Sequence, residues 1–323
     1  MIQRDQQTAA PFETPAETGR ISDVPGVRVG HTTVVDGDVR TGVTTVVPDP
    51  VPSPARPLRC GLFVGNGHGK LVGATELIEL GELQTPLVLT NTLSTFLAAD
   101  ALTDWMLRRP ECADVVTLNP LVAECNDSWL SDIRARAVHP EHVHAALDGA
   151  DTDFACGAVG AGTGMRALGF KGGIGTASRR VGDHTVGVLA LTNFSGTLSV
   201  GGTVVESPDT VVPEGNSCIM VVATDAPLDA RQLGRVARRS VFAMGTVGAD
   251  YRHGSGDYGI AFSTDRHSAP LTDRRLDPYF RATLDASADA IVSSLWHAPT
   301  TIGRTGHTAH GLQDVLRARG LLS

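Results

Sequence analysis

The sequence predicts a protein of the α+β class. Segments with strand patterns and segments with helical spacing follow one another in blocks, without the regular alternation that builds a parallel α/β sheet. Neither an internal repeat nor a dividing linker is found, so residues 21–323 are expected to form a single domain. Residues 1–20 are polar and rich in Pro, Ala and Thr, which predicts a flexible N-terminal extension.

The first third of the chain is predicted to supply strands and then helices. Val and Thr alternate with turn residues over residues 21–48, a pattern typical of short strands in a meander. Residues 60–81 begin as a strand, break at a glycine turn and continue with helical spacing. A buried strand is predicted over residues 86–94, and a helix follows it over residues 94–109.

The middle of the chain is dense in glycine. Residues 131–148 are predicted to be helical with a break at Pro140. Two glycine-rich segments follow, at residues 157–165 and 169–180, and a strand is predicted over residues 184–196. These glycines are expected to let the backbone pass close to a substrate or to neighbouring strands.

The last third begins with a long loop. Residues 197–216 carry Gly, Pro, Ser and acidic residues, and loops of this length inside a compact domain are usually functional. The apolar run from Cys218 to Ala223 predicts a buried strand directly after the loop. A helix over residues 228–248, a turn and strand over 254–264, and a helix over 284–298 complete the domain.

Composition argues against several classes of partner. The net charge is −8 and Lys and Arg form no block, so nucleic acid is not expected. No apolar stretch approaches the roughly 20 residues that span a bilayer, and no secretory signal is seen, so no membrane is expected and the cytoplasm is predicted. The cysteines are scattered and never spaced as CxxC, so neither disulfides nor a zinc cluster are indicated: Cys60, Cys112, Cys125, Cys156 and Cys218.

One motif resembles a dinucleotide-binding fingerprint. Residues 162–167 match GxGxxA, and Asp183 stands where a ribose-binding carboxylate would be expected. The fingerprint also needs a helix that begins at this turn and presents its amide groups to a pyrophosphate. Further glycines between residues 169 and 175 interrupt such a helix, so no cofactor is expected.

Histidine and serine motifs offer two more alternatives. Two histidine pairs lack a supporting carboxylate, so no metal is expected: His142 with His144, and His307 with His310. Gly254-Ser255-Gly256, preceded by His253, resembles part of a serine-hydrolase elbow, but nothing in the sequence completes a triad.

Ser217 stands where the long loop meets the buried strand, which is the arrangement of an N-terminal nucleophile hydrolase precursor. In such a protein the Ser217 hydroxyl attacks the carbonyl of Asn216, and the chain is cut between the two residues. The freed α-amine of Ser217 has an ordinary pKa of about 7.7 to 8.0, so it can serve as the general base for its own hydroxyl. Serines also open strands as plain turn residues, so this pattern alone leaves both interpretations open.

Seven motifs, in order along the chain, resemble those of the DmpA-type aminopeptidases. This family comprises the L-aminopeptidase/D-amidase-esterases and the β-peptidyl aminopeptidases. The motifs are ISDVPGVRVGHTT, LTNTLS, LVAECNDSWL, GAVGAGTGM, KGGIGTASR, NSCIMVVATDAPL and GSGDYGIAFST, and they span residues 21–264. The resemblance implies a four-layer αββα sandwich, with a precursor cleaved into residues 1–216 and 217–323. It also implies a homotetramer of cleaved protomers.

The resemblance also implies roles for individual residues. Ser217 would be the nucleophile, and Ser255 and Asp257 would match the second serine and acidic partner of the family, placed to orient the new ammonium. Asn193 would donate to the oxyanion. Glu124, with Asn126 beside it, is the candidate for binding the substrate ammonium, although Glu124 could equally cap a helix that starts near Ser128.

Two departures from the family pattern bear on specificity. Asp257 is one methylene shorter than the glutamate of some relatives, and the loop between Asn193 and Ser217 is short for the family.

The predicted activity is release of N-terminal α-, β- or D-residues from short peptides, amides or esters. The alternatives are hydrolysis of ω-amino acid oligomers or other non-peptide amides, and an uncleaved, non-catalytic member of the fold. The ornithine acetyltransferases share the fold but cleave before Thr, so Ser217 argues against that activity.

Overall fold

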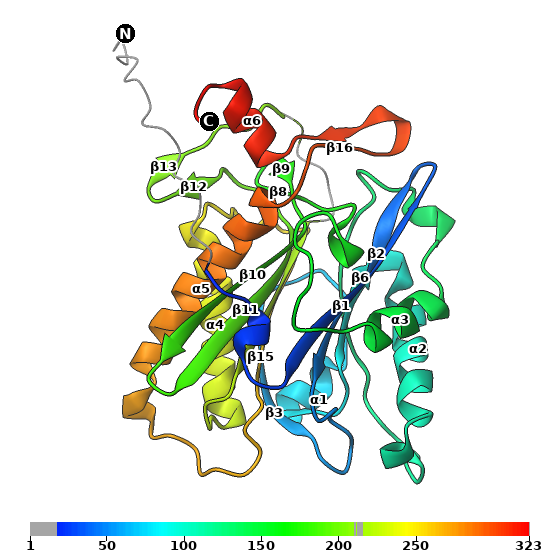
Figure 1. The fold of residues 1–323 in the computed structure, drawn as a ribbon, viewed down its shortest axis with the longest axis vertical. Coiled ribbons are helices and arrows are strands. Elements are labelled where there is room, and N and C mark those ends of the chain that lie inside the picture. Colours follow the sequence, from blue (N-terminus) through cyan, green and yellow to red (C-terminus); the bar gives the residue numbers. More distant parts are fainter. Residues whose placement is uncertain (1–17, 210, 212–215, 323) are drawn as a thin grey trace.

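Two β-sheets are stacked face to face between two layers of helices (Figure 1). The computed structural model describes residues 18–209, 211 and 216–322. Within these residues, the first sheet has five strands: β1 (Val27–Asp36), β2 (Val39–Pro48), β6 (Leu87–Asn91), β7 (Leu121–Cys125) and β4 (Leu71–Val72). The second has six: β10 (Ile174–Val181), β11 (His184–Asn193), β14 (Ser217–Thr224), β15 (Gly256–Ser263), β3 (Leu58–Gly67) and β5 (Glu82–Leu83).

Helices cover the outer face of each sheet. In Figure 1, α4 (Ala230–Thr246) and α5 (Asp277–Trp296) flank the six-stranded sheet, and α2 (Thr95–Leu107) and α3 (Pro140–Asp148) flank the five-stranded one. The predicted αββα order is therefore present in the structure. Smaller elements complete the described chain: α1 (Ala74–Glu79), α6 (Leu312–Ala318), and the hairpins β8 (Arg166–Ala167) with β9 (Phe170–Lys171), β12 (Ser199–Val200) with β13 (Thr203–Val204), and β16 (Thr301–Ile302) with β17 (Thr308–Ala309). Short 3₁₀ helices lie at Ile21–Asp23, Thr92–Ser94, Pro110–Cys112, Ile133–Ala135, Gly160–Gly162, Asp273–Arg275 and Arg304–Gly306.

Apolar side chains fill the three spaces between the four layers. One cluster lies between α4, α5 and the six-stranded sheet, a second between the two sheets, and a third between the five-stranded sheet and α2 and α3. β14 lies in the middle of this arrangement, so both of its faces are covered and all eight of its residues are buried. This explains why its sequence is a continuous apolar run without alternation.

Helix boundaries follow the capping chemistry of the sequence. The Asp229 side chain accepts a hydrogen bond from the backbone N–H of Gln232 at 2.7 Å, and the Gln232 side chain accepts one from the backbone N–H of Asp229 at 3.1 Å. Together they form a capping box at the start of α4. The helix predicted over residues 131–148 with a break at Pro140 is wrong in its first half. Pro140 begins α3, because proline fits the first turn of a helix, where its missing N–H has no partner to lose.

The N-terminal extension and the long loop of the prediction are described only in part. Residues 1–17 of the predicted extension lie outside the described residues, but Thr18 O accepts a hydrogen bond from Ser178 N–H at 2.7 Å. The long loop at 197–216 contains the β12–β13 hairpin, and its residues 210 and 212–215 lie outside the described part of the chain. No helix among the described residues is long and apolar enough to cross a membrane.

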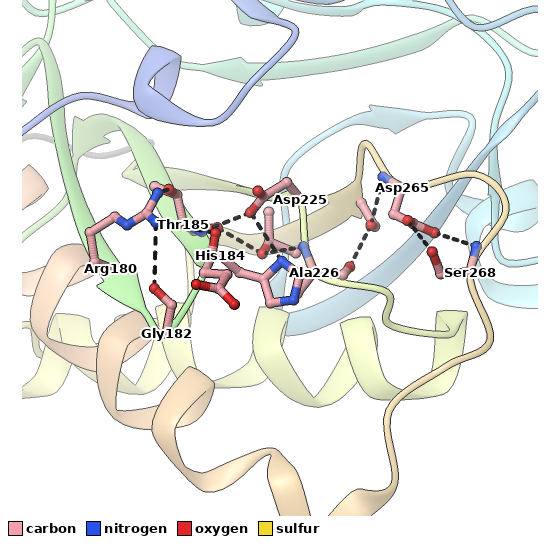
Figure 2. A network of polar contacts seen from close by, with 11 residues as sticks. Arg180, Gly182, His184, Thr185, Asp225, Ala226, Asp265 and Ser268 are labelled. Carbon is pink, nitrogen blue, oxygen red and sulfur yellow. Dashed lines mark hydrogen bonds and ion pairs between the residues drawn. The ribbon is translucent and has the colours of Figure 1, made fainter.

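Strand directions bring the end of β11 and the starts of β14 and β15 together on one side of the six-stranded sheet. β14 runs antiparallel to β11 and parallel to β15, with Ser217 paired to Asn193 on one side and to Gly256 on the other. At the opposite ends of these strands, a polar network ties the connecting turns together (Figure 2). Asp225 accepts from Thr185 N–H at 2.7 Å, and Ser263 Oγ donates to Ala226 O at 2.7 Å. These contacts fix the relative register of the strands that present Ser217.

Candidate active site

The Ser217 side chain lies against the peptide bond that precedes it. Ser217 is buried at the first position of β14, and its Oγ donates a hydrogen bond to Asn216 O at 2.6 Å. The same carbonyl oxygen accepts from Gly256 N–H at 3.2 Å. The Ser217 hydroxyl and the Gly256 N–H group therefore converge on one carbonyl oxygen, so the hydroxyl lies beside the peptide bond that precedes it and the N–H group polarises that bond.

Glycine is required beside Ser217. A Cβ on Gly256 would lie 2.5 Å from Gly69 Cα and 3.3 Å from Ser217 Oγ. A Cβ on Gly69 would lie 3.1 Å from Gly256 Cα and 3.4 Å from Glu124 Oε1. The Glu124 carboxylate and the Ser217 hydroxyl are thus separated by only two closely packed glycines.

Glu124 is a buried carboxylate at the end of β7. Its Oε1 accepts from Lys70 N–H at 2.9 Å, its Oε2 accepts from Thr92 Oγ1, and Lys70 Nζ lies 3.7 Å from Oε1. Residues 128–130 form a turn, so the alternative prediction that Glu124 caps a helix near Ser128 is wrong. A carboxylate accepts about four hydrogen bonds, so this one has the capacity to take an incoming ammonium in addition to these donors.

Ser255 and Asp257 lie at the start of β15, next to Ser217. Ser255 Oγ donates to Asp257 Oδ1 at 2.7 Å, whereas Asp257 Oδ2 is buried and lacks a hydrogen-bond partner among the described residues. Burial raises the pKa of Asp257 to about 6, although the hydrogen bond from Ser255 opposes this shift. A nearby positive charge would offset the burial and keep the carboxylate ionised.

Asn193 and Asn126 contact each other beside Ser217. Asn193 Nδ2 donates to Asn126 O at 2.9 Å, and Asn193 Oδ1 accepts from Arg166 N–H at 3.1 Å. Because Asn193 is also the strand partner of Ser217, its amide is held at the edge of the site. The structure therefore gathers at one place the residues that the sequence analysis singled out: Glu124, Asn126, Asn193, Asn216, Ser217, Ser255 and Asp257.

A cavity of about 340 Å³ opens beside Asn216. Its lining includes Arg166, Ser195, Asp209 and Asn216. Arg166 is buried, and its Nη1 donates to Val211 O at 2.5 Å while its Nη2 lies 3.4 Å from Asp209 Oδ2. Arg166 and Asp209 thereby attach the end of the long loop to the body of the domain.

Comparison with known proteins identifies the family. The sequence matches peptidase family S58 over residues 19–309. The chain belongs to this family. It is 36% identical to the β-peptidyl aminopeptidase BapA of Sphingosinicella xenopeptidilytica over an alignment of 364 residues, gaps included. This alignment covers 98% of this chain and 90% of BapA.

Two solved structures are similar over nearly their whole length. A protein from Pyrococcus horikoshii OT3 has a TM-score of 0.86 and 42% identity, with 96% of both chains covered. The L-aminopeptidase D-Ala-esterase/amidase of Ochrobactrum anthropi, described as a prototype of the serine aminopeptidases and a variant of the Ntn hydrolase fold, has a TM-score of 0.85 and 31% identity. The match covers 97% of this chain and 98% of that one. The predicted family, fold and enzyme class are thus confirmed: this S58 chain is a serine aminopeptidase or amidase of the N-terminal nucleophile type.

The competing motifs lie in ordinary structural settings in this S58 chain. The GxGxxA segment forms a 3₁₀ turn and the short strand β8, so it lacks the helix that pyrophosphate binding requires. Among the described residues, no three His, Cys, Asp or Glu side chains gather as a metal site would need. Each histidine of the two pairs is hydrogen-bonded to a neighbouring group in the fold: His142 to His139 N–H, His144 to Ala101 O, His307 to Trp129 O and His310 to Asp209.

Several groups of the S58 site were missed by the sequence analysis. Gly256 contributes a backbone N–H, and Thr92 holds Glu124. Ser195 accepts a hydrogen bond from the Asn216 side chain at 3.0 Å. Thr92 lies within the LTNTLS motif, so that motif was the available signal, but backbone donors and Ser195 become visible only when the strands are paired.

Proposed function

We propose that the chain cleaves itself between Asn216 and Ser217, and that the mature enzyme uses Ser217 to release N-terminal residues through an acyl-enzyme. The observation that carries the proposal is the 2.6 Å contact between Ser217 Oγ and Asn216 O, with Gly256 N–H bound to the same oxygen. The family membership of the chain and the match to BapA support it as well.

Self-cleavage would proceed in two balanced steps. Ser217 Oγ attacks the Asn216 carbonyl carbon, the C–N bond breaks, and the hydroxyl proton ends on the departing Ser217 amine. This leaves an ester between Asn216 and Ser217 Oγ. Water then hydrolyses the ester, giving a carboxyl group on Asn216 and restoring the Ser217 hydroxyl. During the attack, Gly256 N–H stabilises the negative charge that develops on the carbonyl oxygen.

The mature site would use the Ser217 amine as its general base. This amine has an ordinary pKa of about 7.7 to 8.0, so a large fraction is unprotonated near neutral pH and can take the hydroxyl proton. Asp257 and Ser255 are proposed to orient the amine and to balance its charge after it is protonated. This role is supported by the hydrogen bond between Ser255 and Asp257, and by Asp257 Oδ2, which has no hydrogen-bond partner among the described residues.

Substrate recognition is proposed to depend on three polar side chains around Ser217. Glu124, with Asn126 beside it, would bind the substrate ammonium, and Asn193 would donate to the oxyanion of the tetrahedral intermediate. Loss of one such donor typically costs about 10² to 10³ in rate. Because BapA is named a β-peptidyl aminopeptidase, we propose that N-terminal β-residues are the preferred substrates. The amine base makes neither a metal nor a cofactor necessary for this mechanism.

The proposal extends to assembly and location. The mature protein is proposed to be a cytoplasmic homotetramer of cleaved protomers, with residues 1–20 as a flexible extension to the single domain. The tetramer of cleaved protomers is proposed from the resemblance to the DmpA-type aminopeptidases.

Mass spectrometry and N-terminal sequencing test the cleavage. Wild-type protein should yield residues 1–216 and 217–323, with the second fragment beginning at Ser217. Ser217→Ala should remain one chain of 33.8 kDa and lack peptidase activity, because it has no hydroxyl to attack Asn216. A wild-type chain that stays whole after long incubation would refute the mechanism. Activity surviving in Ser217→Ala would assign the nucleophile to another residue.

A further inference from the structure

Ser195 and Asp250 form a polar pair against the side chain of Asn216. Ser195 Oγ donates to Asp250 Oδ1 at 2.5 Å, and Asn216 Nδ2 donates to Ser195 Oγ at 3.0 Å. Ser195 is buried and Asn216 is half-buried. The three side chains therefore form a directed chain of hydrogen bonds that ends on the residue before the scissile bond.

The backbone holds this pair in register. Asp250 N–H donates to Ser195 O at 3.2 Å, and Thr197 N–H donates to Gly248 O at 3.0 Å. Gly248 has a φ of +103°, and a Cβ there would lie 1.8 Å from Thr197 O. The segment after β11 and the segment after α4 can approach so closely only because glycine stands at this position.

The direction of the hydrogen bonds selects the chemistry of the bound group. The Ser195 hydroxyl proton is used by Asp250, so Ser195 Oγ presents lone pairs towards Asn216. Arg252 Nε lies 2.7 Å from Asp250 Oδ2 and pairs with its charge. A carboxamide N–H fits such an acceptor, whereas a carboxylate would meet lone pairs and the nearby Asp250 charge.

We infer that Ser195 and Asp250 are positioning residues for self-cleavage, forming a carboxamide-binding site that orients Asn216. With its side chain held by Ser195 and its carbonyl held by Gly256 N–H, Asn216 is fixed at two points, and its carbonyl carbon stays within reach of Ser217 Oγ. The inference rests on the proposed cleavage between Asn216 and Ser217. It adds that cleavage depends on the side chain of residue 216 and on a pair of residues remote from it in sequence.

The test is a double-mutant cycle on the rate of self-cleavage. Wild type, Ser195→Ala, Asn216→Ala and the double variant are made by cell-free translation with a short methionine label, and loss of the full-length chain is followed on denaturing gels. Each single variant should cleave about tenfold more slowly, the factor that one well-placed hydrogen bond is worth. The double variant should be no slower than Asn216→Ala, because both changes remove the same contact.

Three further variants separate positioning from general stability. Ser178→Ala is the matched control, since Ser178 Oγ also donates to an aspartate, Asp23, at 2.6 Å, but far from Asn216 in the sheet; it should cleave at the wild-type rate. Ser195→Thr keeps the hydroxyl and should restore most of the rate. Asn216→Asp should cleave more slowly than Asn216→Ala, because its carboxylate is repelled by Asp250.

The outcomes distinguish this inference from the proposed function. Two results would overturn the carboxamide site and leave the proposed function standing. In the first, the wild type cleaves and Ser195→Ala cleaves at a rate within twofold of it. In the second, the rate losses of the two single variants multiply in the double variant. A wild-type chain that is not cleaved at all would overturn both.

Discussion

At the scale of single residues, the site is built from groups whose hydrogen-bonding capacity is only partly used. Glu124 accepts from Lys70 N–H and from Thr92, and both donors are neutral. The only cation within 4 Å of this carboxylate among the described residues is Lys70 Nζ, at 3.7 Å and on a side chain 41% exposed. A substrate ammonium could therefore displace a weakly held lysine and gain a charge-assisted bond.

Glu124→Gln tests that role. In the variant the side-chain oxygen can still accept from Lys70 N–H, and the NH2 group can donate to the Thr92 hydroxyl, but the charge is lost. KM for substrates with a free N-terminal ammonium should therefore rise about ten- to a hundredfold. A panel of β-, α- and D-aminoacyl p-nitroanilides, together with ω-amino acid oligomers, should show the loss throughout. The matched N-acetylated compounds serve as the control, since they carry no ammonium. Equal losses for both sets of compounds would rule out ammonium binding by Glu124.

At the scale of elements, a buried lysine stabilises the glycine-rich segments. Lys171 in β9 is fully buried, and its Nζ donates to Gly162 O at 2.9 Å and Gly172 O at 2.6 Å. Burial lowers the pKa of Lys171 to about 7. Lys171 thus joins the turn at Gly160–Gly162 to β9, next to the strands that carry Asn193 and Ser217.

The lowered pKa of Lys171 predicts a pH dependence of stability. An unfolded lysine has a pKa of about 10.4, so between pH 7 and 8 the unfolded chain binds more protons than the folded one. The free energy of unfolding should therefore rise with pH in this window, by up to about 1.4 kcal/mol per unit from this group. Lys171→Met should lose that contribution.

Urea unfolding at several pH values measures this effect. Both proteins should carry Ser217→Ala, so that a single uncleaved chain unfolds. Subtracting the unfolding free energy of the protein that also carries Lys171→Met from that of the protein with Lys171 isolates the contribution of the lysine from those of the other titrating groups. A difference that is constant from pH 7 to 8 would contradict the prediction.

At the scale of the whole molecule, the proposed cleavage would divide the chain without dividing the fold. β14 belongs to the second fragment but pairs along its whole length with β11 of the first, and β15 pairs with β3 from Gly256 to Phe262. α5 packs on β10 and β11, so one apolar cluster draws its side chains from both fragments. The two fragments would share this cluster and could not separate without exposing it to water.

The cleaved protein should therefore behave as one particle in native solution. Light scattering coupled to size exclusion should give one peak that contains both fragments, at four times 33.8 kDa if the proposed tetramer forms. Denaturing gels of the same peak should show two bands. Fragments that elute separately without denaturant would contradict the shared core, and a peak at 33.8 kDa would contradict only the tetramer.

Much of the fold is predictable from the sequence because local rules decide it. The short, β-branched apolar run at Cys218–Ala223 predicts a strand covered on both faces, and Asp229 with Gln232 marks the start of α4. The helix predicted over residues 131–148 was wrong before Pro140, because an apolar pattern does not show where a helix must begin.

The sequence by itself determined that Ser217 opens a buried strand after a long loop, and its motifs determined the family and the residue types of the site. Tertiary structure alone decided what surrounds the proposed scissile bond: the register that sets Asn193 and Gly256 on either side of Ser217, and the Ser195–Asp250 pair. The reason is physical. These contacts join strands and turns far apart in the chain, and a hydrogen bond between them exists only when the sheets pack and fix the register.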